Sequence, residues 1–159
     1  KEGLYKEVMR QHINEVKDSV QNNMQNSQFK PGTKEYFVAE VSSMVENMIR
    51  FRVNSPEMAK IFAREKLTGM MYSKEVHEEI IYPLIQKFIE SFKEGQKRGF
   101  IHAGIDPVLF FITLSEGIWG FFQMNECQMR LSQDTQALAS NLDEIKNQIL
   151  KIYLTGVLT

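Results

Sequence analysis

Apolar residues recur along the first part of this chain at the three- and four-residue spacing of an amphipathic α-helix. The stripe begins at Leu4 and continues to Met24, after which polar residues lead into Pro31-Gly32. Side chains at this spacing share one helix face, and a Pro-Gly pair is typical of a turn. The pattern therefore predicts one long helix from about Leu4 to about Asn26.

Two further stripes follow, each preceded by a residue that favours a helix start. Thr33 precedes a stripe over residues 36–51, and Ser55-Pro56-Glu57 precedes a shorter stripe over residues 58–67. Ser and Thr cap helix N-termini, and proline fits the first helical position. Gly69 suits the end of the shorter helix, because glycine readily adopts the left-handed conformation found there.

A proline interrupts the next stripe, which runs from Ser73 to about Gly99. Pro83 removes the hydrogen bond to the carbonyl of Glu79 and crowds that turn. The apolar period continues on both sides of Pro83, so we expect a kinked helix rather than two helices.

The last two predicted helices differ in how much of their surface is apolar. Asp106-Pro107 precedes residues 108–122, which are apolar nearly all round, and a final stripe covers residues 142–154. A helix that is apolar all round must be covered on several sides. Six helices joined by short links predict one all-α bundle, and no alternating strand pattern of useful length occurs.

Composition favours a single soluble domain that does not itself bind nucleic acid. The 159 residues are 43% hydrophobic and 25% charged, with a net charge of −1, whereas DNA affinity draws on clustered Lys and Arg. The sequence contains no apolar run of about 18 residues, so we expect no membrane span. The one cysteine, Cys127, suits a buried thiol in the reducing cytoplasm.

Motifs for metal or catalytic chemistry are not found in the sequence. The three histidines, His12, His77 and His102, do not form a Glu-x-x-His or His-Glu-x-x-His pattern, which helical di-iron and zinc sites use. His77 lies among Glu75, Glu78 and Glu79, which we interpret as exposed acids near a helix start. We expect no enzyme activity, metal or cofactor.

Several short motifs, taken in order, resemble the tetracycline-repressor (TetR) family of bacterial transcriptional regulators. Lys1-Glu2-Gly3-Leu4-Tyr5 resembles the segment that follows the family's helix-turn-helix, and Asn54-Ser55-Pro56-Glu57, followed by Arg64-Glu65, resembles a middle segment. Gly95, Gly99-Phe100-Ile101 and Asp106-Pro107 resemble the stretch before the penultimate helix. The resemblance covers nearly the whole chain.

The resemblance implies that residues 1–159 form one effector-binding and dimerisation domain. It implies a homodimer paired through the last two long helices, and a repressor released from DNA by a small hydrophobic or aromatic effector. Operator DNA would be contacted only through a helix-turn-helix head that precedes Lys1 and is not part of this sequence. The segment around Pro83 would be a moving part.

The resemblance also implies a ligand cavity lined by bulky, flexible side chains. Nine methionines and eleven phenylalanines are many for this length, and both residue types suit greasy or flat ligands. The candidate ligand-binding residues are Met44, Met48, Phe51, Met58, Phe62, Phe88, Phe92 and Trp119. An apolar stripe at helical spacing is first of all typical of a packed core, and contact with a ligand is the alternative for each of these residues.

Polar residues beside these stripes could orient a ligand or could face solvent. The five candidates are Asn47, Arg50, His77, Glu116 and Gln123. An inward-facing Arg50 or Glu116 would need a compensating partner, because burying an unpaired charge is costly.

For the dimer, the family pattern points to the last two helices. Gly117 and Gly120 would allow helices to approach closely. The candidate interface residues are Phe111, Ser115, Ile118, Phe122, Ile145, Ile149, Ile152 and Tyr153. Burial within one subunit is the alternative for each of them. A helical dimerisation or interaction module with a packed core and no ligand is the alternative for the chain as a whole.

Overall fold

The structure is a computed structural model that describes residues 2–25, 27–126, 138 and 140–159. Helices dominate the described residues, and the expected all-α class is confirmed. The elements are α1 (Glu2–Gln25), α2 (Lys34–Asn54), α3 (Pro56–Leu67), α4 (Lys74–Val76), the π-helix η1 (His77–Ile81), α5 (Tyr82–Lys97), α6 (Pro107–Glu126) and α8 (Leu142–Thr155). Cys127 lies outside the described residues.

Local signals in the sequence fix most helix ends. The Thr33 hydroxyl accepts the backbone N–H of Tyr36, and the Asp106 carboxylate accepts that of Leu109 at 2.8 Å. Gly69 and Gly99 follow the ends of α3 and α5 with positive φ angles of 74° and 82°. These are the left-handed positions that terminate helices, and glycine adopts them without steric cost.

Helical structure continues across Pro83, and a π-turn takes up the disturbance. The N–H of Tyr82 bonds the carbonyl of His77, five residues earlier, within η1. Because Pro83 has no N–H and its ring crowds the preceding turn, the regular α-ladder cannot pass this point unchanged. A π-turn inserts one extra residue into the helix and keeps it continuous from α4 to α5.

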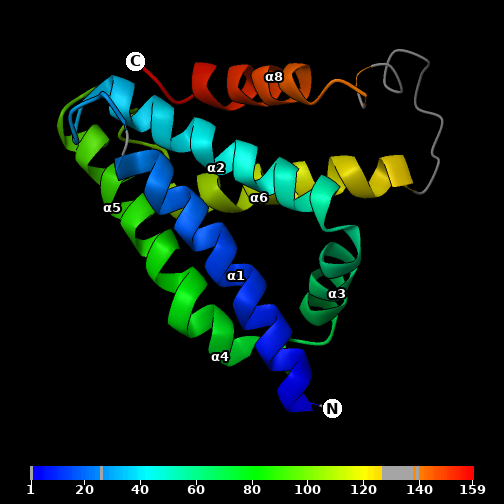
Figure 1. Cartoon of the computed structure of the whole chain (residues 1–159). Coiled ribbons are helices and arrows are strands. Elements are labelled where there is room, and N and C mark those ends of the chain that lie inside the picture. Colours follow the sequence, from blue (N-terminus) through cyan, green and yellow to red (C-terminus); the bar gives the residue numbers. More distant parts are fainter. Residues whose placement is uncertain (1, 26, 127–137, 139) are drawn as a thin grey trace.

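The helices form two groups that meet at α2. Figure 1 shows α2, α6 and α8 running across the upper part of the molecule, and α2 contacts both of the others. Helix α1 lies diagonally beside α4 and η1, while α3 connects α2 to α4 near the N-terminal end of α1 (Figure 1). A short antiparallel bridge between Ile101 and Leu158 joins the segment between α5 and α6 to the C-terminal segment.

Apolar side chains pack into two separate clusters. The main core lies between α2, α5, α6 and α8 and is built around Phe37, Phe92 and Leu114. The second, which we call the aromatic cluster, joins α1, α3, α4, η1 and single residues of α2 and α6. Its members are Met9, Ile13, Phe51, Met58, Ile61, Phe62, Val76, Ile80, Ile81 and Trp119.

Helix α6 departs from one sequence expectation. Among the described helices, residues 107–124 are long and apolar enough to cross a membrane, judged by length and composition alone. The core helix of a soluble protein passes the same test. Here Phe110, Leu114 and Ile118 on α6 are buried in the main core, but only 28% of residues 107–124 are buried, so core packing within this chain covers a minor part of the helix.

Candidate functional site

The eight candidate ligand-binding residues divide equally between the two clusters. Met44, Met48, Phe88 and Phe92 belong to the main core or pack directly against it. Phe51, Met58, Phe62 and Trp119 belong to the aromatic cluster, where they converge from α2, α3 and α6. The structure therefore brings four of the eight together beside the π-helix, and we take the aromatic cluster as the candidate site.

Phe51 is the central ring of the aromatic cluster. Its centroid lies 5.6 Å from that of Phe62 and 6.1 Å from that of Trp119. The imidazole of His12 meets it edge-on at 5.9 Å, so α1 contacts the cluster through a ring as well as through Met9 and Ile13. Edge-to-face rings at such distances attract one another and hold the cluster together.

Two cations flank Trp119. The guanidinium carbon of Arg52 lies 5.3 Å from the indole ring and the ammonium of Lys66 lies 5.2 Å from it. Lys66 also pairs with the carboxylate of Glu116. Arg52 is only 5% exposed, which is unusual for a charged residue. Contact of two cations with an electron-rich ring is a favourable arrangement.

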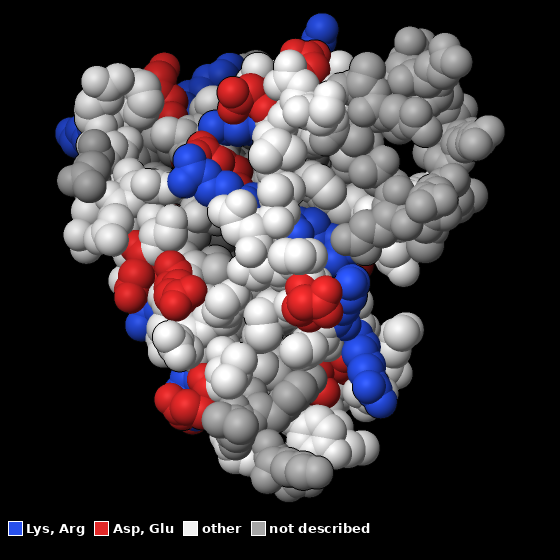
Figure 2. Space-filling model, turned by 45° about the vertical axis from the view of Figure 1, so that its right-hand side comes forward, with Lys and Arg blue, Asp and Glu red and all other residues white. Residues whose placement is uncertain are grey.

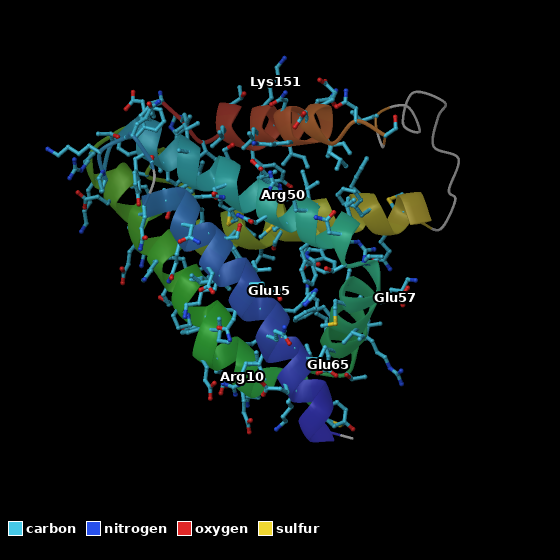
Figure 3. The ribbon with its side chains drawn as sticks, in the orientation of Figure 1. Arg10, Glu15, Arg50, Glu57, Glu65 and Lys151 are labelled. Atoms are coloured by element: carbon cyan, nitrogen blue, oxygen red, sulfur yellow. The ribbon has the colours of Figure 1, made fainter. Side chains whose placement is uncertain are left out.

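A buried carboxylate holds the connection between α3 and α4. Glu65 is 3% exposed and accepts the backbone N–H groups of Tyr72 and Ser73, each at 3.0 Å. Figure 3 shows Glu65 at the lower end of α3, close to α1. Because a carboxylate needs such donors when it leaves water, Glu65 fixes the loop that leads into α4 and η1.

Helix α1 is attached to α2 through polar contacts. Ser19 donates to the Asn47 side chain at 2.8 Å, and Asn23 donates to the Ser43 hydroxyl at 3.2 Å. On its other side, Arg10 pairs with Glu79 at 2.5 Å, and Figure 3 shows Arg10 beside α4. Buried apolar contacts of α1 are concentrated at Met9 and Ile13.

His12 and Ser55 form the polar contact of α1 nearest to the aromatic cluster. His12 Nε2 lies 2.9 Å from Ser55 Oγ, and Glu15 lies 3.5 Å from the other ring nitrogen. The order carboxylate, imidazole, hydroxyl resembles that of a hydrolase triad. However, the Glu15 side chain is 60% exposed, so water screens its effect on the ring. We interpret the His12–Ser55 bond as a link between α1 and the α2–α3 turn.

The polar candidates take different positions. Asn47 is buried, and besides receiving the Ser19 bond it donates to the Ser43 carbonyl at 2.8 Å. His77 is half-buried with its ring 5.7 Å from that of Phe62. Arg50 is exposed and pairs with Glu46 at 2.5 Å, while Glu116 and Gln123 are also exposed. His77 is therefore the candidate of this group that contacts the aromatic cluster.

The candidate interface residues are also split. Ile118, Phe122 and Ile145 are buried in the main core of this chain. Phe111, Ser115, Ile149 and Tyr153 are half-buried. Ile152, by contrast, is 70% exposed.

Other exposed apolar residues, Leu109 and Ile112 on α6, were not among the interface candidates and are 60% and 49% exposed. We call Leu109, Ile112 and Ile152 the α6–α8 apolar face.

Arg52 and Glu65 were not among the candidate site residues, although Glu65 belongs to the middle segment of the family resemblance and a signal for both was present. Arg52 follows Ile49 by three residues and Glu65 follows Phe62 by three, so each continues an apolar stripe. Residues three apart lie on the same helix face. A charge at such a position predicts either a broken stripe or a buried, partnered charge, and the structure shows the latter.

An open surface pocket of about 390 Å³ lies away from the aromatic cluster. It is lined by Asn23, Met24, Ser27, Gln28, Phe29, Ala39, Ser42, Ser43 and Glu46, at the end of α1 and along α2. Sites for small greasy molecules are enclosed and mostly apolar. This wide, polar hollow does not fit such a ligand, so the pocket does not replace the aromatic cluster as the candidate site.

Glu40 is a half-buried acid on α2 whose carboxyl group faces α5. Burial raises the pKa of its carboxyl to about 7, although a hydrogen bond with Ser91 opposes the rise. Its Oε2 atom is buried without a hydrogen-bond partner among the described residues. The pKa of Tyr36 is also raised, mainly because its hydroxyl is partly buried and to a smaller extent because the negative charge of Glu40 lies nearby.

Comparisons with known proteins do not identify the chain. Neither protein-family models, nor curated proteins, nor solved structures give a significant match. In the part of the chain that the structure describes, no group of three or more His, Cys, Asp or Glu side chains is arranged to hold a metal ion.

Proposed function

We propose that this chain is the effector-sensing and dimerisation domain of a TetR-like transcriptional regulator. The observation that carries the proposal is the convergence of Phe51, Met58, Phe62 and Trp119 in one cluster that also contacts α1. The order of the sequence motifs supports the same function.

The aromatic cluster has the properties of a site that accepts a flat, greasy molecule. Phe51 and Trp119 supply aromatic rings for stacking once their present neighbours are displaced, and the flexible Met58 side chain adapts to different shapes. The adjacent π-helix is a feature often found at functional sites. The rings are in contact, so a ligand enters by displacing them. It shifts the position of α1 only if it binds the two arrangements unequally.

The α6–α8 apolar face supports pairing of two copies. Leu109 and Ile112 are a helical turn apart on α6, and the Tyr153 hydroxyl of α8 bonds the Thr113 carbonyl of α6 at 2.8 Å. Each large apolar side chain left in water forgoes about 1.5–3 kcal/mol of burial energy. A second copy would cover these residues.

The charged side chains on the face drawn in Figure 2 are of both signs.

Ring packing also favours a second candidate function, a dimerisation module that takes no ligand. Phe51 touches three other rings, and Phe62 meets both Phe51 and His77. Rings packed in this way stabilise the domain whether or not a ligand exists. The two functions differ in whether Trp119 responds to added small molecules.

Fluorescence of Trp119 tests the sensing function directly, because the sequence contains one tryptophan. Flat aromatic compounds are titrated while the emission of Trp119 and the melting temperature are followed. We expect at least one compound to change the emission and to stabilise the chain, by about 2.7 kcal/mol at 100-fold its Kd. Met58→Ala should weaken binding, whereas Met48→Ala, in the main core, should not.

A panel that leaves both the emission and the melting temperature unchanged would favour the ligand-free module. Sedimentation tests the pairing separately. Leu109→Glu with Ile112→Glu should convert a dimer to a monomer, while Leu67→Glu should not. Leu67 is 88% exposed at the end of α3 and is not one of the residues of the α6–α8 apolar face. A monomeric unsubstituted chain would overturn the pairing.

A further inference from the structure

Ser55 uses its hydroxyl differently from the residues that cap α2, α6 and α8. Three residues at helix starts accept a backbone N–H three positions on: Thr33 from Tyr36, Asp106 from Leu109 and Asn141 from Glu144. Ser55 occupies the same position before α3, but its ψ angle is 57°, whereas Thr33 and Asn141 have the extended ψ angles of 160° and 92°, and its side chain makes no bond to the α3 backbone. Capping of α3 by Ser55 therefore also requires an extended backbone at this residue. The Oγ atom of Ser55 lies 2.9 Å from His12 Nε2 on α1 instead.

Because the Ser55 hydroxyl contacts His12, the first turn of α3 has no side-chain cap. The first amides of a helix have no partner within the helix, and a serine hydroxyl normally accepts one of them. Pro56 has no N–H, so the amides concerned are those of Glu57 and Met58. A hydrogen bond between Ser55 and His12 and one between Ser55 and either of these amides have similar free energies. Hydrogen-bond strength alone therefore does not favour one arrangement over the other.

We propose that the Ser55 hydroxyl is a two-position switch that couples α1 to α3. When the hydroxyl bonds His12, α1 is held against the α2–α3 turn and the start of α3 is uncapped. When α1 moves away, the hydroxyl turns to the amide of Glu57 or Met58 and caps α3. Release of His12 from Ser55 and capping of α3 then occur together.

The position of Phe51 connects this switch to the aromatic cluster. The His12 ring contacts Phe51 at 5.9 Å, and Phe51 contacts Phe62 and Trp119. A molecule that displaces Phe51 also displaces the ring that holds the Ser55 hydroxyl. This regulatory use rests on the proposed sensing function, whereas the exchange of the hydroxyl itself does not.

Hydrogen exchange measured by NMR tests the switch in the full chain without any ligand. His12→Phe keeps an aromatic ring against Phe51 and removes the nitrogen that bonds Ser55. We expect the exchange of the Glu57 or Met58 amide to slow about fivefold, which corresponds to a cap of about 1 kcal/mol. Ser55→Ala alone should leave these amides unchanged, and adding it to His12→Phe should abolish the slowing.

Two further variants separate the switch from general loosening of α1. Ser19→Ala removes another bond between α1 and α2 but does not free Ser55, so the exchange at the start of α3 should stay as it is. His12→Ala should slow the same amides as His12→Phe. The switch is overturned if His12→Phe leaves them unprotected, if the double variant stays slow, or if Ser19→Ala slows them equally. A chain that binds no ligand and does not dimerise would still give the expected exchange pattern.

Discussion

The hydroxyl of Tyr153 occupies the space into which a side chain at Gly117 would project. A Cβ atom at Gly117 would lie 2.6 Å from Tyr153 Oη, and the same hydroxyl donates to the Thr113 carbonyl at 2.8 Å. Gly117 therefore permits the close approach of α6 and α8 within one chain. A Cβ at Gly120, one turn further along α6, would meet nothing within 4 Å.

Gly117→Ala and Gly120→Ala should consequently change the free energy of unfolding in opposite directions. Alanine in an open helix position stabilises by up to about 1 kcal/mol relative to glycine, so Gly120→Ala should raise stability. Gly117→Ala should lower it by roughly 1–3 kcal/mol through overpacking. Urea titration at a fixed protein concentration measures both.

The Tyr153 hydroxyl can be removed to check the cause of this effect. In a Tyr153→Phe background the obstruction is gone, and Gly117→Ala should become neutral or stabilising. A loss that persists in this background would show that the Tyr153 hydroxyl is not the obstruction.

Glu40 should make the stability of the domain depend on pH. Its pKa is raised from the ordinary 4.5 to about 7 in the folded chain, so the folded state holds a proton that the unfolded state has released. The free energy of unfolding should therefore fall as pH rises from about 4.5 to about 7 and then level off. The total loss is on the order of 3 kcal/mol.

Glu40→Gln keeps the shape of the side chain and cannot ionise. It should be more stable than the unsubstituted chain at pH 8 and should differ little from it at pH 4.5. Glu90→Gln, at an exposed position on α5, is the matched control and should leave the pH profile unchanged. If the free energy of unfolding of Glu40→Gln and that of the unsubstituted chain depend on pH in the same way, the burial of the Glu40 carboxyl group is refuted.

Glu65 should contribute to stability through the loop between α3 and α4. Removing its carboxylate leaves the amides of Tyr72 and Ser73 without their acceptor, and an unpaired buried group costs about 1–3 kcal/mol. Glu65→Ala should lower the free energy of unfolding by at least this amount and should speed hydrogen exchange at residues 72 and 73. Glu57→Ala, at an exposed position on the same helix, should change stability by less than about 0.5 kcal/mol.

The sequence was most informative where structure is decided locally. Thr33 and Asp106 cap the expected helices, and Gly69 and Gly99 end theirs, because a side-chain cap or a left-handed residue acts within one turn. The cap assigned to Ser55 was only half right. The residue lies at the expected position, but a histidine 43 residues away takes its hydroxyl.

The candidate site depended on packing that the sequence does not contain. Met48 and Phe51 lie three residues apart on α2, yet one packs on the main core and the other belongs to the aromatic cluster. Helical spacing places both on an apolar face without saying which neighbour covers each of them. In the same way, the apolar character of α6 did not distinguish Ile118, which is buried in this chain, from Ile112, which is exposed.

The π-turn before Pro83 has a geometric consequence for the whole fold. One additional residue rotates everything that follows by about 100° around the helix axis. Val76 on α4 and Ile80 on η1 belong to the aromatic cluster, while Phe88 and Phe92, further along on α5, belong to the main core. The continuous helix formed by α4, η1 and α5 thus contributes side chains to both hydrophobic clusters. Deleting one residue within 77–81 would rotate either the Val76 and Ile80 side chains or the Phe88 and Phe92 side chains toward water.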